Sequence, residues 1–169
     1  MNPTLAGQIF ESFLHPGERA IATHKLSSFG VNAIPVLESL FSGEAKNSWG
    51  VSYSRLGMPI YCGLITAKLL GSLAKPLEPF IRECLHSAEG GMYAVEALRA
   101  IGTLDETSIV ELAACLNKNT SLAWEVAYTL HCCGAEKNEA VIEIANSSQK
   151  ISRILIDARK SYYKNLLNS

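Results

Sequence analysis

The chain has 169 residues, of which 48% are hydrophobic and 18% are charged. This length and balance are those of a globular domain with a substantial core, and they exclude an intrinsically disordered chain. Fifteen basic and sixteen acidic residues give a formal net charge of −1, so the composition does not indicate a nucleic-acid-binding protein.

The first predicted element is a helix that begins at Asn2 and Pro3 and ends near the HPG sequence at residues 15–17. Asn is a favoured N-cap, and Pro is a favoured first helical residue. The apolar side chains of one side of this helix are Leu5, Ile9, Phe10 and Phe13. The segment lacks the basic start and long apolar stretch of a signal peptide, and no segment approaches the ~18 apolar residues of a membrane span. We therefore expect a cytosolic protein.

A repeated pattern follows, in which a Gly comes after small and apolar residues at helical spacing and precedes a second amphipathic segment. The glycines, spaced 41, 31 and 32 residues apart, are Gly30, Gly71, Gly102 and Gly134. Each should end a first helix, because Gly adopts the left-handed conformation without a Cβ penalty. Pro35 and Pro76 are expected to begin second helices. The pattern predicts four helix pairs, at about residues 17–42, 59–87, 90–117 and 120–147.

The longer first spacing places an inserted loop at residues 43–58, which carries Trp49, Tyr53 and Arg55. Insertions between repeats project from one face of an array and often bind partners. Trp, Tyr and Arg are also the side chains enriched at interface hot spots. The alternative is that Trp49 folds back over the first repeat and covers its core.

The five cysteines form no CxxC pair and are odd in number, so we expect reduced thiols rather than disulfides. Cys84 and Cys115 occupy equivalent positions of two units, which indicates a packing role. The HCC sequence at residues 131–133 could suggest a thiol nucleophile, but apolar neighbours on a helix would raise the pKa of these thiols. The four histidines show no metal-ligand spacing, and there is no P-loop or GxSxG motif. The sequence therefore predicts no catalytic residues, no metal ligands and no cofactor.

A final helix is predicted at residues 149–167. Its apolar stripe consists of Ile151, Ile154, Leu155, Ala158 and Tyr162. Its opposite face is basic, with Lys150, Arg153, Lys160 and Lys164. Such a face is expected to be solvated, and the alternative is a docking strip for an acidic partner.

The recurring small residue, Leu and Gly, followed by AIPVL or AKPLEPF, resembles the HEAT-repeat family of α-solenoids over residues 17–147. The resemblance implies an all-α fold, a right-handed α–α superhelix of about four helix pairs with N- and C-terminal capping helices. Residues 1–169 would then form one domain, and the second helices would line its concave side.

Residues 89–143 contain nine acidic and three basic residues. The concave side is predicted to be acidic, because the second helices carry six acids against three bases: Glu38, Glu78, Glu83, Glu111, Glu139 and Glu143 against Lys75, Arg82 and Lys118. An acidic wall beside an aromatic loop favours a basic protein partner. The predicted partner-binding residues are Glu38, Trp49, Tyr53, Arg55, Glu83, Glu111 and Glu143.

Among compact repeat proteins, the chain resembles bacterial immunity proteins that neutralise a toxin. The resemblance implies a non-catalytic, cytoplasmic antitoxin whose partner is a basic toxin domain, such as a nuclease of contact-dependent growth inhibition. The first alternative is a scaffold or adaptor for host complexes. The second is an enzyme similar to HEAT-like DNA glycosylases, against which the acidic middle of the chain argues, since a DNA groove needs phosphate contacts.

Overall fold

The computed structural model describes residues 3–87, 90–118 and 121–168 of the chain, and its regular secondary structure is helical. Over these residues the strand-like feature is a single isolated antiparallel bridge between Lys46 and Ser52. The predicted all-α class is therefore confirmed. The predicted N-cap, Asn2, lies outside the described residues.

The helices follow one another with short connections, except for the inserted loop between α3 and α4. In chain order they are α1 (Pro3–Leu14), α2 (Arg19–Ser27), α3 (Ile34–Phe41), α4 (Met58–Leu70), α5 (Glu78–Glu83), α6 (Gly91–Ile101), α7 (Glu106–Lys118), α8 (Ala123–Cys132), α9 (Glu139–Ser147) and α10 (Gln149–Leu167). Short 3₁₀ segments connect several of them: η1 (Gly30–Ala33), η2 (Tyr53–Leu56), η3 (Gly71–Leu77), η4 (Cys84–His86) and η5 (Ala135–Lys137).

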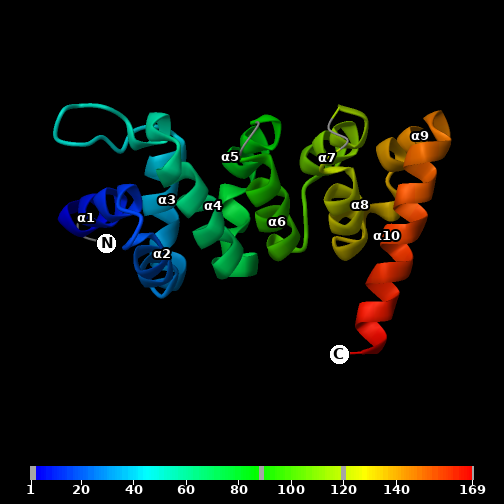
Figure 1. Cartoon of the computed structure of the whole chain (residues 1–169), viewed down its shortest axis with the longest axis horizontal. Coiled ribbons are helices and arrows are strands. Elements are labelled where there is room, and N and C mark those ends of the chain that lie inside the picture. The colour runs from blue at the N-terminus through cyan, green and yellow to red at the C-terminus, as the bar shows by residue number, and fades with distance from the viewer. Residues whose placement is uncertain (1–2, 88–89, 119–120, 169) are drawn as a thin grey trace.

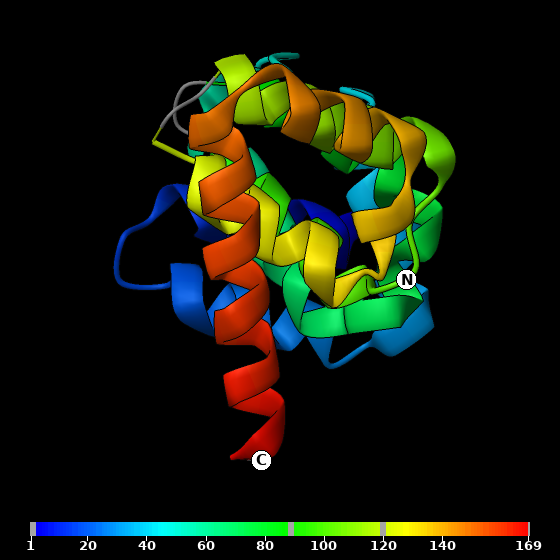
Figure 2. The same cartoon turned by 90° about the vertical axis from the view of Figure 1, so that its right-hand side faces the viewer.

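The helices pack in two layers along the long axis of the molecule (Figure 1). In the even layer, α2, α4, α6, α8 and α10 contact one another in succession. In the odd layer, α3 contacts α5, α5 contacts α7, and α7 contacts α9. The layers are joined where α3, α5, α7 and α9 pack against α4, α6, α8 and α10 respectively. Figure 2 shows that α10 crosses the end of this arrangement and extends beyond the other helices.

The glycine spacing explains where the chain turns. All four repeated glycines have a positive φ, between 56° and 83°. Gly134 adopts the predicted left-handed helical conformation, whereas Gly71 and Gly102 combine a positive φ with ψ angles of −133° and −61°. Pro35 lies in the first turn of α3, as expected. Pro76 does not begin α5, because the chain first forms the 3₁₀ segment η3 around it, and Pro79 takes the position in the first turn instead.

The core is one continuous apolar cluster that runs from Ile9 in α1 to Ala158 in α10. Its centre contains leucines from several helices whose side chains are fully buried. Among them are Leu26, Leu37, Leu64, Leu98 and Leu130. Each helix thus buries its apolar face against neighbouring helices of the two layers.

A buried carboxylate joins the second unit to the third. Glu78, at the start of α5, is fully buried and accepts a hydrogen bond from the backbone N–H of Asp105 (2.8 Å). Lys75 is paired with the same carboxylate and also donates to Asp105 Oδ1 (2.8 Å) and to the carbonyl oxygen of Thr103 (2.9 Å). A cation of one unit thus holds the acidic start of the next odd-layer helix, α7.

Candidate protein-binding surfaces

The two layers carry opposite charge. The odd-layer helices present six carboxylates that are exposed or partly exposed, against two cations, Arg82 and Lys118. These carboxylates are Glu38, Glu83, Glu106, Glu111, Glu139 and Glu143. The even-layer helices carry nine Lys and Arg side chains against three acids. The acidic character of the second helices was expected from the sequence, whereas the basic character of the even layer was expected only for its last helix, α10.

The four predicted acidic binding residues all lie in the odd layer, one on each helix. Glu38, Glu83 and Glu143 are exposed and have no ion pair within the described part of the chain. Glu111 is partly exposed, and its Oε2 lies 3.0 Å from Nε2 of His86. Three of the four carboxylates are therefore free to meet a cationic partner, and the fourth also bridges α7 to η4.

The inserted loop is a tight turn that presents Trp49 at its tip. The side-chain oxygen of Asn47 accepts hydrogen bonds from the backbone N–H groups of Trp49 and Val51, both at 3.0 Å. Trp49 is 81% exposed, so the alternative in which this ring covers the first repeat is wrong. Arg55 is also exposed, on the 3₁₀ segment η2. Figure 1 shows the loop projecting from the α1 end of the array.

Tyr53 lies in the core and not on the binding surface where the sequence placed it. Its side chain is 3% exposed, its ring centroid lies 5.2 Å from that of Phe10, and its hydroxyl donates to Glu11 Oε1 (2.6 Å). Burial, with the hydrogen bond and negative charge of Glu11, raises the pKa of this hydroxyl above its usual range. Tyr53 thus has the covering role that the alternative gave to Trp49, and α1 holds the base of the loop.

An aromatic cluster on the even layer was not predicted. Trp124 and Tyr128 are stacked with centroids 5.2 Å apart, and the ring of Tyr162 meets Tyr128 edge-on at 6.3 Å. Arg99, which is paired with Glu125 at 2.9 Å, lies over the Tyr128 ring. These residues come from α6, α8 and α10, so no local sequence pattern links them.

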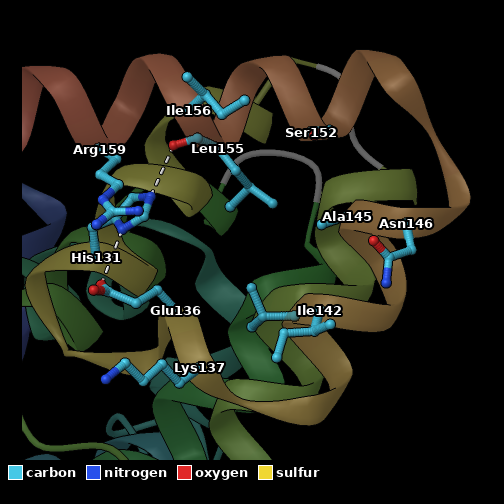
Figure 3. Close-up of a pocket in the computed structure, with 11 residues that line it drawn as sticks. His131, Glu136, Lys137, Ile142, Ala145, Asn146, Ser152, Leu155, Ile156 and Arg159 are labelled. Atoms are coloured by element: carbon cyan, nitrogen blue, oxygen red, sulfur yellow. Dashed lines mark hydrogen bonds and ion pairs between the residues drawn. The ribbon is translucent and has the colours of Figure 1, made fainter.

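A cavity of about 300 Å³ opens between α9 and α10 (Figure 3). Its apolar lining comes from Val141, Ile142, Ala145, Leu155 and Ile156. His131 of α8, which is buried, closes one end: its Nε2 lies 2.8 Å from the carbonyl oxygen of Leu155, and its Nδ1 lies 3.1 Å from Glu136 Oε2. The sequence did not indicate this cavity.

The cysteine thiols are poorly suited to nucleophilic chemistry. Burial raises the pKa of all five, to about 11 for Cys84 and about 12 for Cys133. Cys84 is partly buried and Cys115 is buried, which fits the packing role predicted for both. Across residues 3–87, 90–118 and 121–168, no group of three or more His, Cys, Asp or Glu side chains could hold a metal ion. Nor does this part of the chain contain a helix with the length and apolar character needed to cross a membrane.

Comparison of the chain with models of protein families, with curated proteins and with solved structures finds no match in any of the three. The assignment of function therefore depends on the surfaces described above.

Proposed function

We propose that this protein is a HEAT-like solenoid of four helix pairs that binds a basic protein through its odd layer. The pairs are α2 with α3, α4 with α5, α6 with α7, and α8 with α9, with α1 and α10 as the terminal helices. The succession of contacts within each layer supports this assignment, because stacked pairs bury their apolar faces against the neighbouring pairs.

The observation that carries the proposal is the separation of charge between the layers. Six carboxylates against two cations on the odd layer create a negative potential that attracts a basic partner and repels an acidic one. Trp49 and Arg55 lie on the loop beside α3, and exposed Trp and Arg side chains favour a protein interface.

The partner class that fits best is a toxin nuclease, whose substrate groove is basic, and the protein would then be its cytoplasmic immunity protein. An acidic, non-catalytic surface could occlude such a groove by direct contact. The alternative function is a scaffold that holds two proteins, and the apolar cavity between α9 and α10 favours it as a second contact surface.

Genomic position separates these functions, because an immunity gene lies directly downstream of the toxin sequence. The toxin domain encoded there should bind the wild-type chain in titration calorimetry. Two variants should each weaken binding by about tenfold or more. Trp49→Ala removes an aromatic anchor, and the double variant Glu111→Lys with Glu143→Lys reverses the local charge.

A matched control changes the net charge equally outside the odd layer. Glu18→Lys with Asp157→Lys should leave the affinity within about twofold, because long-range charge effects are screened at physiological salt. Circular dichroism checks that all variants remain folded. Unchanged affinity in both the Trp49 and the double Glu variants would show that the odd layer is not the binding surface.

A further inference from the structure

The odd layer ends one helix before the even layer. Each of α3, α5 and α7 has a following odd-layer helix packed against it, whereas no odd-layer helix follows α9 in the described part of the chain. The even layer continues to α10, which packs against both α8 and α9. Beyond α9, the described residues place no odd-layer helix against α10, and the cavity of about 300 Å³ lies between these two helices (Figure 3).

The residues that face this position correspond to residues that face the next helix in earlier units. Arg82, eleven residues after Gly71, donates to Ser108 of the following helix α7 (3.3 Å). Ala113, eleven residues after Gly102, is fully buried, and α7 is covered by α9. Ala145 has the same position relative to Gly134, lines the cavity and is only partly buried. The face of α9 that carries Ala145 thus has the small residue of a helix-packing face, but no helix of the described residues covers it.

The size of the apolar surface favours a helix over a small molecule. Ile142 is 47% exposed and Ile156 is 50% exposed, and they lie on the two helices that border the cavity. In Figure 3, Ile142 and Leu155 point into the space between the two helices. A small ligand inside the cavity would leave much of both isoleucines in water, whereas a helix in the groove would cover them.

The charged residues of the cavity lining indicate which kind of helix the groove would bind. Lys137, in the 3₁₀ segment before α9, and Arg159 of α10 both line the cavity, and neither has an ion pair among the residues that the structure describes. The one nearby carboxylate of the lining, Glu136, is engaged by His131. In the second unit, Lys75 of the corresponding 3₁₀ segment holds Asp105 at the start of the next odd-layer helix. Lys137 does not occupy the position of Lys75, since it lies three residues after Gly134 whereas Lys75 lies four residues after Gly71. Its cation, with that of Arg159, nevertheless lies at the cavity without a carboxylate partner in the described part of the chain, so it favours a helix with an acid in its first turn, which also suits the helix dipole.

We propose that the groove between α9 and α10 binds an amphipathic helix of a partner protein, whose apolar face covers Ile142, Ala145 and Ile156 and whose first-turn Asp or Glu pairs with Lys137. This site shares α9 with the acidic odd-layer surface, but Glu139 and Glu143 do not line the cavity, whose unpaired charges among the described residues are the cations Lys137 and Arg159. It therefore goes beyond the proposed function and can fail independently of it.

The probe is a synthetic helical peptide of about 14 residues, stapled on its polar face because short helices are marginal in water. It carries leucines at i, i+3, i+4 and i+7 and acids in its first turn. A second peptide differs only in having lysines in place of those acids. Fluorescence anisotropy should show that the acidic peptide binds the wild-type chain at least about tenfold more tightly than the basic one.

The variants test the apolar and the charged contacts separately. Ile142→Asp should weaken binding of the acidic peptide by about tenfold or more, and Lys137→Glu should reverse the preference toward the basic peptide. Arg153→Glu, on an exposed position of α10 that does not line the cavity, is the charge-matched control and should retain the wild-type preference.

Absence of binding to the wild-type chain at millimolar peptide, or equal affinity of the two peptides for Lys137→Glu, would overturn the proposal. Analytical ultracentrifugation of the wild-type chain tests whether a second copy of the chain occupies the groove. A dimer that Ile142→Asp dissociates would place a second copy of this chain in the groove and would also overturn the assignment to a partner helix.

Discussion

At the scale of single residues, the hydroxyl of Tyr53 fixes the inserted loop to α1. It donates to Glu11 at 2.6 Å in a site where its ring is 3% exposed. Tyr53→Phe keeps the ring but leaves the carboxylate without this donor, so we expect a loss of about 1–2 kcal/mol in the free energy of unfolding. Urea denaturation of both proteins at pH 7 measures this difference in the free energy of unfolding.

The same hydroxyl contributes a pH dependence with a defined sign. Burial and the neighbouring Glu11 hold the pKa of Tyr53 above its usual value, so the unfolded chain ionises first, near pH 10. The stabilisation by Tyr53 is complete below that pH and is lost as the pH rises further. The difference in stability between the wild type and Tyr53→Phe should therefore shrink above about pH 10, and a constant difference would contradict this account.

Cys84 provides a second test at this scale. Its thiol is partly exposed, but burial, with the charge of Glu83, raises its pKa to about 11. Because only the thiolate reacts, alkylation by iodoacetamide at pH 8 should be on the order of a hundredfold slower than that of glutathione. Mass spectrometry of the tryptic peptide measures the rate, which should still be rising at pH 10. A plateau near pH 9 would show an ordinary thiol.

At the scale of elements, the junction between η3, α5 and α7 depends on a buried charge. Hydrogen bonds to Asp105 and Glu78 outweigh the effect of burial and hold the pKa of Lys75 above its usual value. Lys75→Met leaves the fully buried Glu78 carboxylate without its cation, so unfolding should become easier by about 3 kcal/mol. Thermal and urea denaturation measure the change.

The double variant Lys75→Met with Glu78→Leu is the control for this junction. It removes both the buried carboxylate and its cation. The N–H of Asp105 then lacks its acceptor, and the Thr103 carbonyl and Asp105 carboxylate lack the Lys75 donor as they do in the single variant, so the double variant should recover part of the lost stability. A double variant less stable than Lys75→Met alone would mean that Glu78 stabilises the junction without its cation.

The predictability of these elements from sequence differs with the distance between the interacting residues. The turns at the repeated glycines follow from local backbone preferences, and their positive φ angles were predicted correctly. Pro76 was misplaced because a 3₁₀ segment can also accommodate a proline before a helix. Both Trp49 and Tyr53 were expected at an exposed binding surface, and only Trp49 is exposed; the burial of Tyr53 against Phe10 in α1 could not be predicted because it joins residues far apart in sequence. The groove of α9 and α10 depends likewise on stacking and not on a motif.

At the scale of the whole molecule, stability should vary along the array, because each helix packs only against its neighbours. The middle helices α4, α6 and α8 are covered on both sides, and residues such as Leu64 and Leu98 are fully buried. The end of α10 is open to solvent, with Leu167 88% exposed. Amide hydrogen exchange should therefore be slowest in α4, α6 and α8 and fastest at the end of α10.

Cavity-forming variants distinguish a stacked array from a single cooperative core. Leu98→Ala in α6 should cost about 2–5 kcal/mol and reduce the protection of α4 and α8 together, because both pack against α6. Leu155→Ala in α10 should reduce the protection of α10 itself and of α8 and α9, which pack against it. The protection of α2 and α4 should not change. If Leu155→Ala lowered protection equally in every helix, the units would unfold as one, and the nearest-neighbour description of this chain would be wrong.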